Sequence, residues 1–370
     1  MSKRPADRSA SSYGAESTTR LPWVGRFLAP ALSILVYVLL GGADLSAAGR
    51  ATAAIGILMA VLWMTEAMPV PVTALIPIVL FPLAGVLEIG EATAPYADEI
   101  IFLFMGGFML ALAMQRWELH QRIALVIVRL VGTKPRRLIG GFMIATAFLS
   151  MWISNTATTV LMLPIAVSIV GLIMTQLEHR GELPDDQGEA DDGPEFAAGA
   201  PMFATGLMLA VAYSASIGSV ATLIGTPPNL FMRAFLRSNY DIEIGFAEWM
   251  LVGLPLAVVF LLIAWVALTR FLYPPEIDEI PGGKALVQGQ LDELGAMSRG
   301  EKIVLTIFLL TASAWILREP LSGWDWLTGY LPWVANLTDA GIAIAAAISL
   351  FAVPVEPREG VFVMNWETAR

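Results

Sequence analysis

The sequence contains no cysteine and only two histidines, His120 and His179, among its 370 residues. The absence of thiols excludes disulfide bonds, thiolate catalysis and cysteine-ligated metal sites, and two imidazoles are too few for a histidine-rich metal or haem site. Charged residues are also scarce, at 15% compared with about 25% in an average soluble domain. Nothing in their distribution resembles a nucleic-acid footprint, so no nucleic-acid partner is expected.

Apolar side chains, by contrast, are abundant, at 56% compared with about 45–50% in an average soluble domain. They occur in blocks, and several blocks approach the roughly 17–25 residues that cross a hydrocarbon core about 30 Å thick. The sequence therefore predicts an all-α polytopic protein of the lipid bilayer, with about eight transmembrane helices and no strands. The blocks occupy residues 27–40, 51–64, 72–87, 251–268, 303–317 and 341–353.

The placement of Lys and Arg in short loops predicts the orientation in the membrane. Residues 1–26 are polar and carry five basic side chains, whereas residues 88–99 carry four acids and no Lys or Arg. A second basic stretch follows at 116–137. We therefore expect a cytoplasmic N-terminal tail at 1–26, a cell inner membrane location, and first helices at about 27–42, 51–67, 72–88 and 99–117.

Two of the apolar segments are interrupted by polar residues. Segment 138–175 contains Ile-Ser-Asn-Thr-Ala-Thr-Thr at 153–159, and segment 201–236 contains Ser-Ile-Gly-Ser at 216–219 and Gly-Thr-Pro-Pro-Asn at 225–229. Non-helical backbone inside a bilayer costs several kcal/mol for each unsatisfied group, unless protein or a water-filled cavity supplies partners. Transporters use such breaks to bind ions and substrates. We predict a re-entrant hairpin at 138–175 and a broken helix at 201–236, followed by helices at about 247–271, 301–317 and 339–353.

The residue types at the breaks indicate what they bind. Hydroxyl, amide and carbonyl oxygens are hard ligands for an alkali cation, and a half-helix N-terminus offers N–H groups to a carboxylate. Ser154, Asn155 and Thr156 are therefore candidates for both roles. A lone Ser or Thr usually bonds the carbonyl of the preceding turn, but an uninterrupted polar run together with a second break favours binding. We interpret Arg233 and Arg237 as snorkelling side chains rather than as attractors of anions.

At these positions the chain resembles the divalent anion/sodium symporter family, which includes bacterial and animal dicarboxylate and citrate carriers. The resemblance covers nearly the whole chain after residue 27 and rests on four blocks in one order. They are Trp-Met-Thr-Glu-Ala-Met-Pro-Val-Pro-Val-Thr-Ala-Leu at 63–75, Phe-Met-Gly-Gly-Phe-Met-Leu-Ala at 104–111, Ser-Asn-Thr-Ala-Thr-Thr at 154–159, and Ala-Ser-Ile-Gly-Ser-Val-Ala-Thr-Leu-Ile-Gly-Thr-Pro-Pro-Asn at 215–229.

The resemblance implies sodium-coupled symport of a C4-dicarboxylate such as succinate, malate or fumarate, with citrate and sulfate as further possible anions. It places Na⁺ at Ser150, Ser154, Asn155 and Gly218. It places the substrate carboxylate at Asn155 and Thr156, with Ser219 nearby in a position where a second glycine is common in the family. The residues that would shape the second break are Thr222, Gly225, Thr226, Pro227 and Asn229.

The resemblance also implies an inverted-repeat elevator transporter that works as a homodimer when full-length. Residues 27–300 would hold the first scaffold helices and the first transport-domain repeat, and residues 301–370 would begin the second repeat. A second Ser-Asn-Thr motif is expected beyond Arg370, so the sequence is interpreted as a truncated form.

Three other interpretations are weighed against symport. A proton-coupled or exchange-type anion transporter of the same superfamily is less favoured, because a proton relay needs titratable groups close to the breaks. An intramembrane hydrolase with Ser154 as nucleophile needs an adjacent base, and neither histidine lies in an apolar segment, so no enzyme is expected. A non-transporting fragment or interaction partner is the third.

Overall fold

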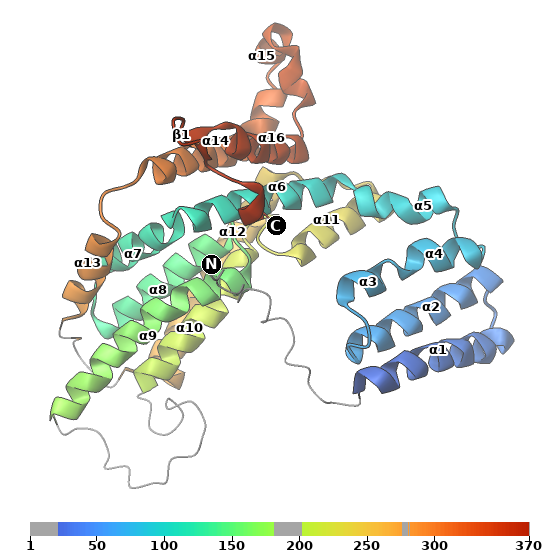
Figure 1. Ribbon diagram of the computed structural model, residues 1–370, viewed down its shortest axis with the longest axis horizontal. Helices are drawn as coiled ribbons and strands as arrows, with labels where there is room; N and C mark the ends of the chain where they lie inside the picture. Colours follow the sequence, from blue (N-terminus) through green and yellow to red (C-terminus); the bar gives the residue numbers. More distant parts are fainter. Residues whose placement is uncertain (1–20, 181–201, 276–279, 281, 370) are drawn as a thin grey trace, which may run out of the picture. The chain divides into compact units, whose positions relative to one another are not determined.

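The computed structural model describes residues 21–180, 202–275, 280 and 282–369, so most of the tail expected at 1–26 lies outside the described residues. The chain divides into two compact units, Met1–Asp98 and Glu99–Arg370, and the described residues are almost entirely helical (Figure 1). Among them, seven helices are long and apolar enough to cross a membrane, and two shorter apolar helical stretches occupy Val70–Leu83 and Asp339–Ala352. The expected all-α polytopic membrane protein is confirmed. The seven spans are Pro22–Gly42, Ala47–Met64, Ile89–Arg116, Asn155–Leu172, Met202–Ser219, Phe246–Leu272 and Arg299–Ser322.

The first unit is built on two neighbouring helices, α1 and α2. Ser33 Oγ of α1 donates to the Ala54 carbonyl of α2 at 2.8 Å, and Arg26 Nε donates to the Ala67 carbonyl at 3.0 Å. Its buried core is small, consisting of Ala29, Leu62 and Ala67. The elements are α1 (Leu21–Leu39), η1 (Leu40–Gly42), α2 (Ala47–Met64), α3 (Val70–Ala74), α4 (Ile76–Leu83), α5 (Ile89–Thr93) and η2 (Ala94–Ala97).

The single helix expected at 72–88 is wrong, because the structure divides it into α3 and α4. Pro77 lies in the first turn of α4 and has no backbone N–H to donate. Its ring would also clash with the carbonyl four residues earlier if the helix continued. The chain therefore ends one helix at Ala74 and starts another at Ile76.

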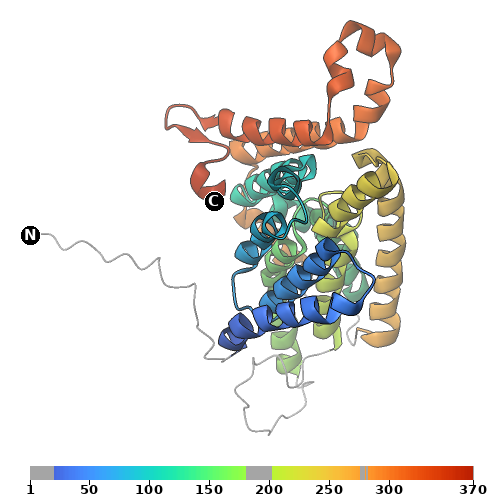
Figure 2. The ribbon, with the colours of Figure 1, turned by 90° about the vertical axis from the view of Figure 1, so that its right-hand side faces the viewer.

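The second unit holds the two interrupted segments. In it α8 lies against both α7 and α10, and α16 packs against α6. Figure 2 shows the C-terminal helices, in orange and red, above the teal ribbon of α6. The contact of α6 with α16 is close, because a Cβ on Gly106 would stand 2.5 Å from the Ala343 carbonyl. The elements are α6 (Glu99–Arg116), α7 (Leu119–Val131), α8 (Pro135–Ser150), α9 (Asn155–Arg180), α10 (Met202–Ser219), α11 (Pro227–Tyr240), α12 (Phe246–Val266), the π-helical turn η3 (Ala267–Leu272), α13 (Gly283–Glu293), α14 (Arg299–Ser322), α15 (Asp325–Tyr330), η4 (Pro332–Asn336), α16 (Asp339–Ala352), β1 (Pro354–Glu356), β2 (Val361–Phe362) and α17 (Trp366–Ala369).

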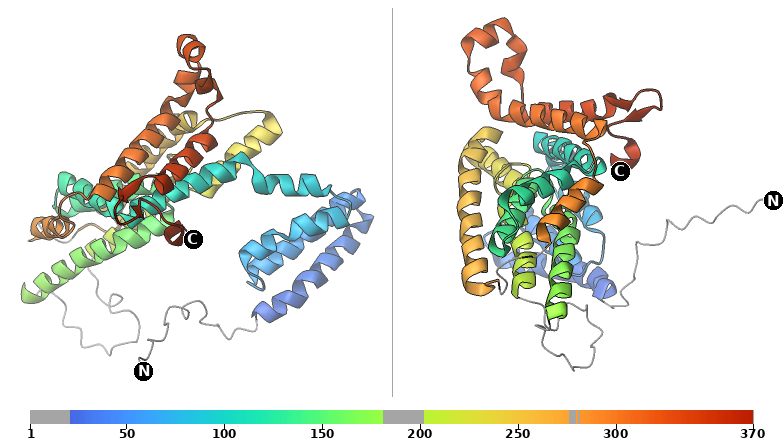
Figure 3. Two further views of the ribbon diagram at one scale, coloured as in Figure 1. Left: turned by 45° about the horizontal axis from the view of Figure 1, so that its top comes forward. Right: turned by 90° about the vertical axis from the view of Figure 1, so that its left-hand side faces the viewer.

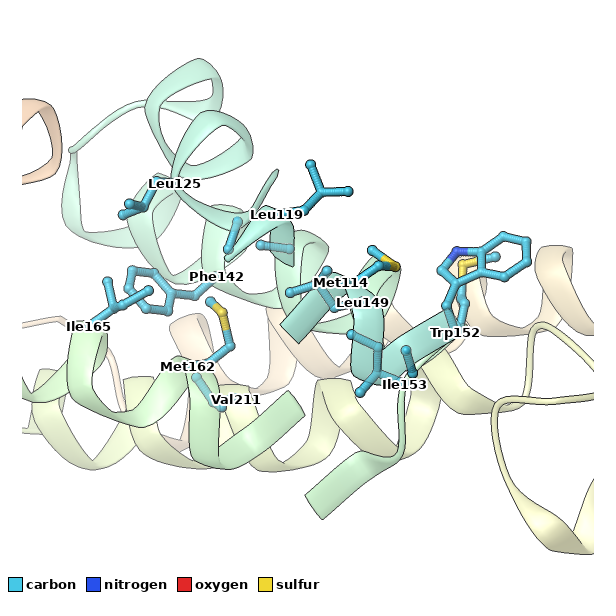
Figure 4. Close-up of a cluster of buried hydrophobic side chains, with 14 of the residues drawn as sticks. Met114, Leu119, Leu125, Phe142, Leu149, Trp152, Ile153, Met162, Ile165 and Val211 are labelled. Carbon is cyan, nitrogen blue, oxygen red and sulfur yellow. The ribbon is translucent and has the colours of Figure 1, made fainter. Parts of the chain in front are cut away.

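The core of this unit forms where α6 to α10 meet. Phe142 and Leu149 of α8 are fully buried, and Met162 of α9 lies beside Val211 of α10 (Figure 4). These residues belong to one continuous cluster of buried apolar side chains. Both interrupted segments are therefore held against one another by packing, which fixes the positions of their non-helical residues.

Two features of the second unit differ from the expectation. The amphipathic helix α7 was not predicted; at 13 residues it is too short to cross a bilayer, and it buries Leu119, Leu125 and Val128 while Arg122 faces polar partners. The expectation of no strands is also wrong at one place, since β1 and β2 pair antiparallel near the C-terminal end. Both α7 and the strand pair are short, so their sequence patterns are weaker signals than the long apolar run of a membrane span.

His120, in α7 and outside the candidate spans, is 2% exposed. Its Nδ1 lies 3.0 Å from the Met114 carbonyl, which can only accept, so Nδ1 carries the proton of the neutral ring and donates. The other nitrogen, Nε2, is buried without a hydrogen-bond partner. Burial lowers the pKa of His120, outweighing the opposing effects of the Met114 hydrogen bond and of Glu118.

We predict that acid destabilises the protein through His120. The folded pKa lies below that of the unfolded chain, so the unfolded state binds more protons as the pH falls below about 6.5. The free energy of unfolding should then decrease by at most about 1.4 kcal/mol per pH unit for this proton. Thermal unfolding in detergent between neutral and mildly acidic pH tests this. The substitution His120→Asn should flatten the profile in that range, and an unchanged profile would contradict the assignment.

Candidate functional site

Both predicted breaks are present in the structure. α8 ends at Ser150 and α9 begins at Asn155, so residues 151–154 are non-helical. α10 ends at Ser219 and α11 begins at Pro227, so residues 220–226 are non-helical. The first break lies slightly before the polar run at 153–159, most of which forms the first turns of α9. α9 is the long light-green helix in Figure 3.

The N-termini of two half-helices face one pocket of about 230 Å³. Ser154 caps α9, since its Oγ accepts from the Ala157 N–H at 3.3 Å. Thr226 precedes α11, and Pro227 occupies the first turn, where a missing N–H costs nothing. The positive ends of two helix dipoles therefore converge, which favours an anion. The pocket is lined by Phe104, Gly107, Phe108, Trp152, Ser154, Asn155, Thr156, Ile224, Gly225, Thr226 and Pro227.

Three oxygens meet beside this pocket. Ser150 Oγ lies 2.9 Å from Asn155 Oδ1 and 2.7 Å from the Ala215 carbonyl oxygen. A serine hydroxyl has one proton, so it donates to only one of these acceptors at a time. The other contact is satisfied either when the Asn155 amide turns its Nδ2 towards Ser150 or when a small cation is ligated by all three oxygens. Because α8, α9 and α10 each supply one oxygen, the packing of the two interrupted segments creates the cluster.

The second break is held by its own side chains. Asn229 Nδ2 donates to the carbonyls of Ser219 at 2.9 Å and Thr222 at 2.8 Å, and Thr222 Oγ1 donates to the Met151 carbonyl across the two breaks. A Cβ on Gly225 would stand 2.3 Å from the Ser219 carbonyl, so only glycine fits there. Carbonyls that leave the helix thus receive partners, as backbone in apolar surroundings requires.

Behind the first break lies an aromatic cluster. Trp152 packs edge-on against Phe308 of α14, with ring centroids 4.9 Å apart, and Phe246 of α12 stacks on Trp315 at 4.7 Å. Such pairs contribute about 0.5–1.5 kcal/mol beyond the area they bury. The cluster ties Trp152, and with it residues 151–154, to α12 and α14.

Most residues expected at the site are brought together. Ser154, Asn155, Thr156, Gly225, Thr226 and Pro227 line the pocket, and Ser150 contacts Asn155. Gly218, Thr222 and Asn229 are buried in the surrounding scaffold. Ser219 does not line the pocket, since it is 2% exposed and its Oγ donates to the Ser216 carbonyl at 2.9 Å. Its role in substrate binding stays a prediction.

Sequence reasoning missed several contributors to the site, including Phe104, Phe108 and Ile224, which line the pocket. The Ala215 carbonyl has no side-chain signal, and Trp152 precedes the polar run. Gly107 lies within the Phe-Met-Gly-Gly-Phe-Met-Leu-Ala block at 104–111, which carried the family resemblance without a role being assigned to it. The interpretation of Arg233 as a snorkelling side chain is wrong, since it pairs with the buried Asp339. Arg237 is half-exposed and pairs with the exposed Glu99 and Glu243, so for Arg237 the interpretation stays a prediction.

Helices interrupted inside an apolar helical protein, with two helix N-termini at a shared pocket, are typical of the class of secondary transporters. Comparison with known proteins agrees, since the model of the sodium:sulfate symporter transmembrane region matches residues 21–370. The chain belongs to this family, whose description is that of a transporter rather than an enzyme.

Curated relatives carry a more specific name. The chain is 37% identical over 348 residues to the sodium-dependent dicarboxylate transporter SdcS of Staphylococcus saprophyticus, covering 94% of this chain and 63% of that protein. It is 38% identical over 349 residues to SdcS of Staphylococcus aureus strain USA300, with the same two shares. The chain thus spans less than two thirds of the length of these relatives.

We predict that Gly218→Ala disrupts the contact between α8 and α10. Its Cβ would stand 2.2 Å from the Ala147 carbonyl oxygen and 2.4 Å from the Ala147 Cα, both of which are backbone atoms. The two helices must then move apart, which costs about 1–3 kcal/mol. Thermal unfolding in detergent measures the loss. The matched control is Gly289→Ala in α13, where nothing lies within 4 Å of the added Cβ; it should be neutral or stabilising. Equal stability of the two variants would refute the close contact.

Proposed function

We propose that this chain provides the sodium and substrate site of a secondary active transporter, which carries a C4-dicarboxylate such as succinate, malate or fumarate together with Na⁺. The observation that carries the proposal is the shared pocket, where two helix N-termini meet beside the oxygens of Ser150, Asn155 and Ala215. The names of the relatives, which are sodium-dependent dicarboxylate transporters, support it.

The proposed roles follow the chemistry of the atoms. Na⁺ binds at Ser150, Ser154, Asn155 and Gly218, where hydroxyl, amide and carbonyl oxygens are available. One substrate carboxylate binds at Asn155 and Thr156, next to the N-terminus of α9, with Ser219 behind them. A bound cation beside the carboxylate lowers the cost of bringing either charge out of water, and this mutual attraction couples the two ligands.

The character of the pocket favours sodium over protons as the coupling ion. None of the described residues that line it titrates near neutral pH. A proton-coupled mechanism needs a group that gains and loses a proton at the site. Oxygen ligands without titratable protons suit an alkali cation at constant pH.

The wider arrangement is proposed on the same basis. Residues 27–300 hold the first scaffold helices and the first transport repeat, with the hairpin at 138–175 and the broken helix at 201–236, and residues 301–370 begin the second repeat. The whole transporter is a homodimer in the cell inner membrane with its N-terminus in the cytoplasm. The excess of Lys and Arg at the N-terminus supports that orientation.

The proposal predicts that sodium stabilises the folded chain and that Asn155 is required for the effect. A ligand at about 100 times its Kd stabilises the folded state by about 2.7 kcal/mol. The melting temperature of the purified chain should therefore rise in sodium chloride relative to potassium chloride at equal ionic strength and fixed pH. Succinate should add a further rise only when sodium is present.

Asn155→Ala should abolish the difference between sodium and potassium. The matched control is Asn239→Ala, because Asn239 is exposed and bonds only Phe235 and Ser238 of its own helix. Equal melting temperatures of the unmodified chain in the two salts would refute the proposal. Uptake of labelled succinate by proteoliposomes, with and without a sodium gradient at fixed pH, separates sodium coupling from proton coupling.

A further inference from the structure

The second unit contains another pocket, of about 470 Å³, with a different character. It shares two helices with the first pocket. On α6 it is lined by Glu99, and on α11 by Arg233 and Arg237, whereas the first pocket touches α6 at 104–108 and α11 at Pro227. At 1.5 Å per residue, Arg233 lies about 9 Å along the helix axis from Pro227. The remaining charged residues of this second pocket are Glu243, Glu248, Arg318, Glu319 and Asp339.

Asp339 lies at the centre of these charges and is the most deeply buried of the ion-paired residues. Its side chain is 1% exposed, and it stands between two guanidinium groups. Arg318 Nε of α14 lies 2.8 Å from Oδ1, and Arg233 Nη2 of α11 lies 3.5 Å from Oδ2; both contacts are ion pairs by distance, and neither carboxylate oxygen accepts a hydrogen bond from the described residues. Trp315 Nε1 also donates to the Asp339 backbone carbonyl at 3.0 Å, which fixes this turn of α16 against α14.

A carboxylate at this depth needs its cationic partners. Two charges taken out of water lose several kcal/mol of hydration each, and removing one partner leaves the other uncompensated. Such pairs are therefore weak sources of stability, but they discriminate strongly between the arrangement that keeps them together and any that separates them. Asp339 ties Arg233 to Arg318, and therefore α11 to α14 and α16.

α11 has few other attachments. Of its residues only Asn229 and Leu230 are buried, and both lie in its first turn. Beyond that turn, Arg233 and Arg237 make ion pairs, the latter with Glu99 and Glu243, whose side chains are substantially exposed. Exposed pairs contribute about 0–1 kcal/mol. The buried pair with Asp339 is thus the main constraint on the direction of α11.

We infer that Asp339 is a positioning residue for the transport site, acting through Arg233 on α11 and thereby on Thr226 and Pro227 at the edge of the pocket. The role in transport rests on the proposed function, whereas the effect of Asp339 on the position of α11 does not. Without the Asp339 charge, Arg233 loses its buried partner and moves toward solvent. α11 then becomes free to shift as a whole against α14 and α16, and the Thr226 edge of the pocket, which continues directly into α11, opens.

Because the sequence has no cysteine, a single introduced thiol reports on this edge without background. Thr226→Cys in the full chain, in detergent or proteoliposomes, is labelled with a membrane-impermeant maleimide and the rate is measured. In the Asp339→Asn background, which keeps the side-chain shape and removes the charge, the rate should rise about tenfold, equivalent to about 1.4 kcal/mol in the opening equilibrium. Asp339→Glu, which keeps the charge, should restore most of the slow rate.

The matched control is Glu301→Gln. Glu301 makes a buried ion pair with Arg122 at 2.6 Å at the other end of α14, with no contact to α11 among the described interactions. This variant should leave the labelling of Thr226→Cys unchanged. An equal acceleration would show that loss of any buried pair loosens the protein, which overturns the inference.

A double-substitution cycle tests whether the effect passes through Arg233. Arg233→Met alone should accelerate labelling as much as Asp339→Asn does, and the two together should give no further increase. Additive effects, or an unchanged rate in Asp339→Asn, would overturn the inference. If Asp339→Asn fails to fold, Arg233→Met carries the same test.

The labelling readout needs neither sodium nor substrate, so it is independent of whether the chain binds sodium. A sodium-insensitive melting temperature with accelerated labelling in Asp339→Asn would remove the proposed function and keep the positioning role. A sodium-sensitive melting temperature with unchanged labelling in Asp339→Asn would keep the proposed function and remove the positioning role.

Discussion

The structure depends on one constraint, which is that backbone polar groups surrounded by apolar side chains must find partners. Continuous helices satisfy it within themselves, but the second unit departs from helix at residues 151–154 and 220–226. Each departure is compensated locally: the Ser154 hydroxyl caps α9, and the Asn229 amide donates to two carbonyls. Residues of both breaks also line one pocket. The candidate site is thus formed by the same non-helical segments whose backbone these contacts stabilise.

The close packing of the helices decides which polar groups of the two breaks come into contact. Gly218 lets α10 approach the backbone of α8 at Ala147, and this approach brings the Ala215 carbonyl to the Ser150 hydroxyl. Trp152 of the first break packs against aromatic rings of α12 and α14. A backbone carbonyl such as that of Ala215 cannot be adjusted by side-chain rotation, so its position in the site is only as accurate as this helix packing. This gives a physical reason for a glycine at the contact of α8 with α10 and for large aromatic side chains around Trp152.

The sequence was sufficient to predict the two breaks, because polar runs and Pro-Pro inside apolar segments are local signals. It also placed the Ser154-Asn155-Thr156 group at the pocket. The bounds were less accurate, since the polar run continues into α9 as helix. Asp339 could not be found in this way: its partners Arg233 and Arg318 are far apart along the chain, and an aspartate at the start of a helix is expected for local reasons alone. Only folding reveals that the charge is buried between two arginines.

Each end of α14 is held by a buried or half-buried ion pair. Near its start Glu301 receives two contacts from Arg122, which also bonds the carbonyls of Leu294 and Gly295. Near its end Arg318 meets Asp339. Between these points Phe308 and Trp315 carry the aromatic cluster behind the first break. α14 is therefore linked to both breaks. It contacts the first through aromatic packing against Trp152, and it is connected to the second through the ion pairs of Asp339 with Arg318 and Arg233. The second break therefore has two supports, namely the hydrogen bonds of its own Asn229 and Thr222 and the link from α11 to α14 through the ion pairs of Asp339.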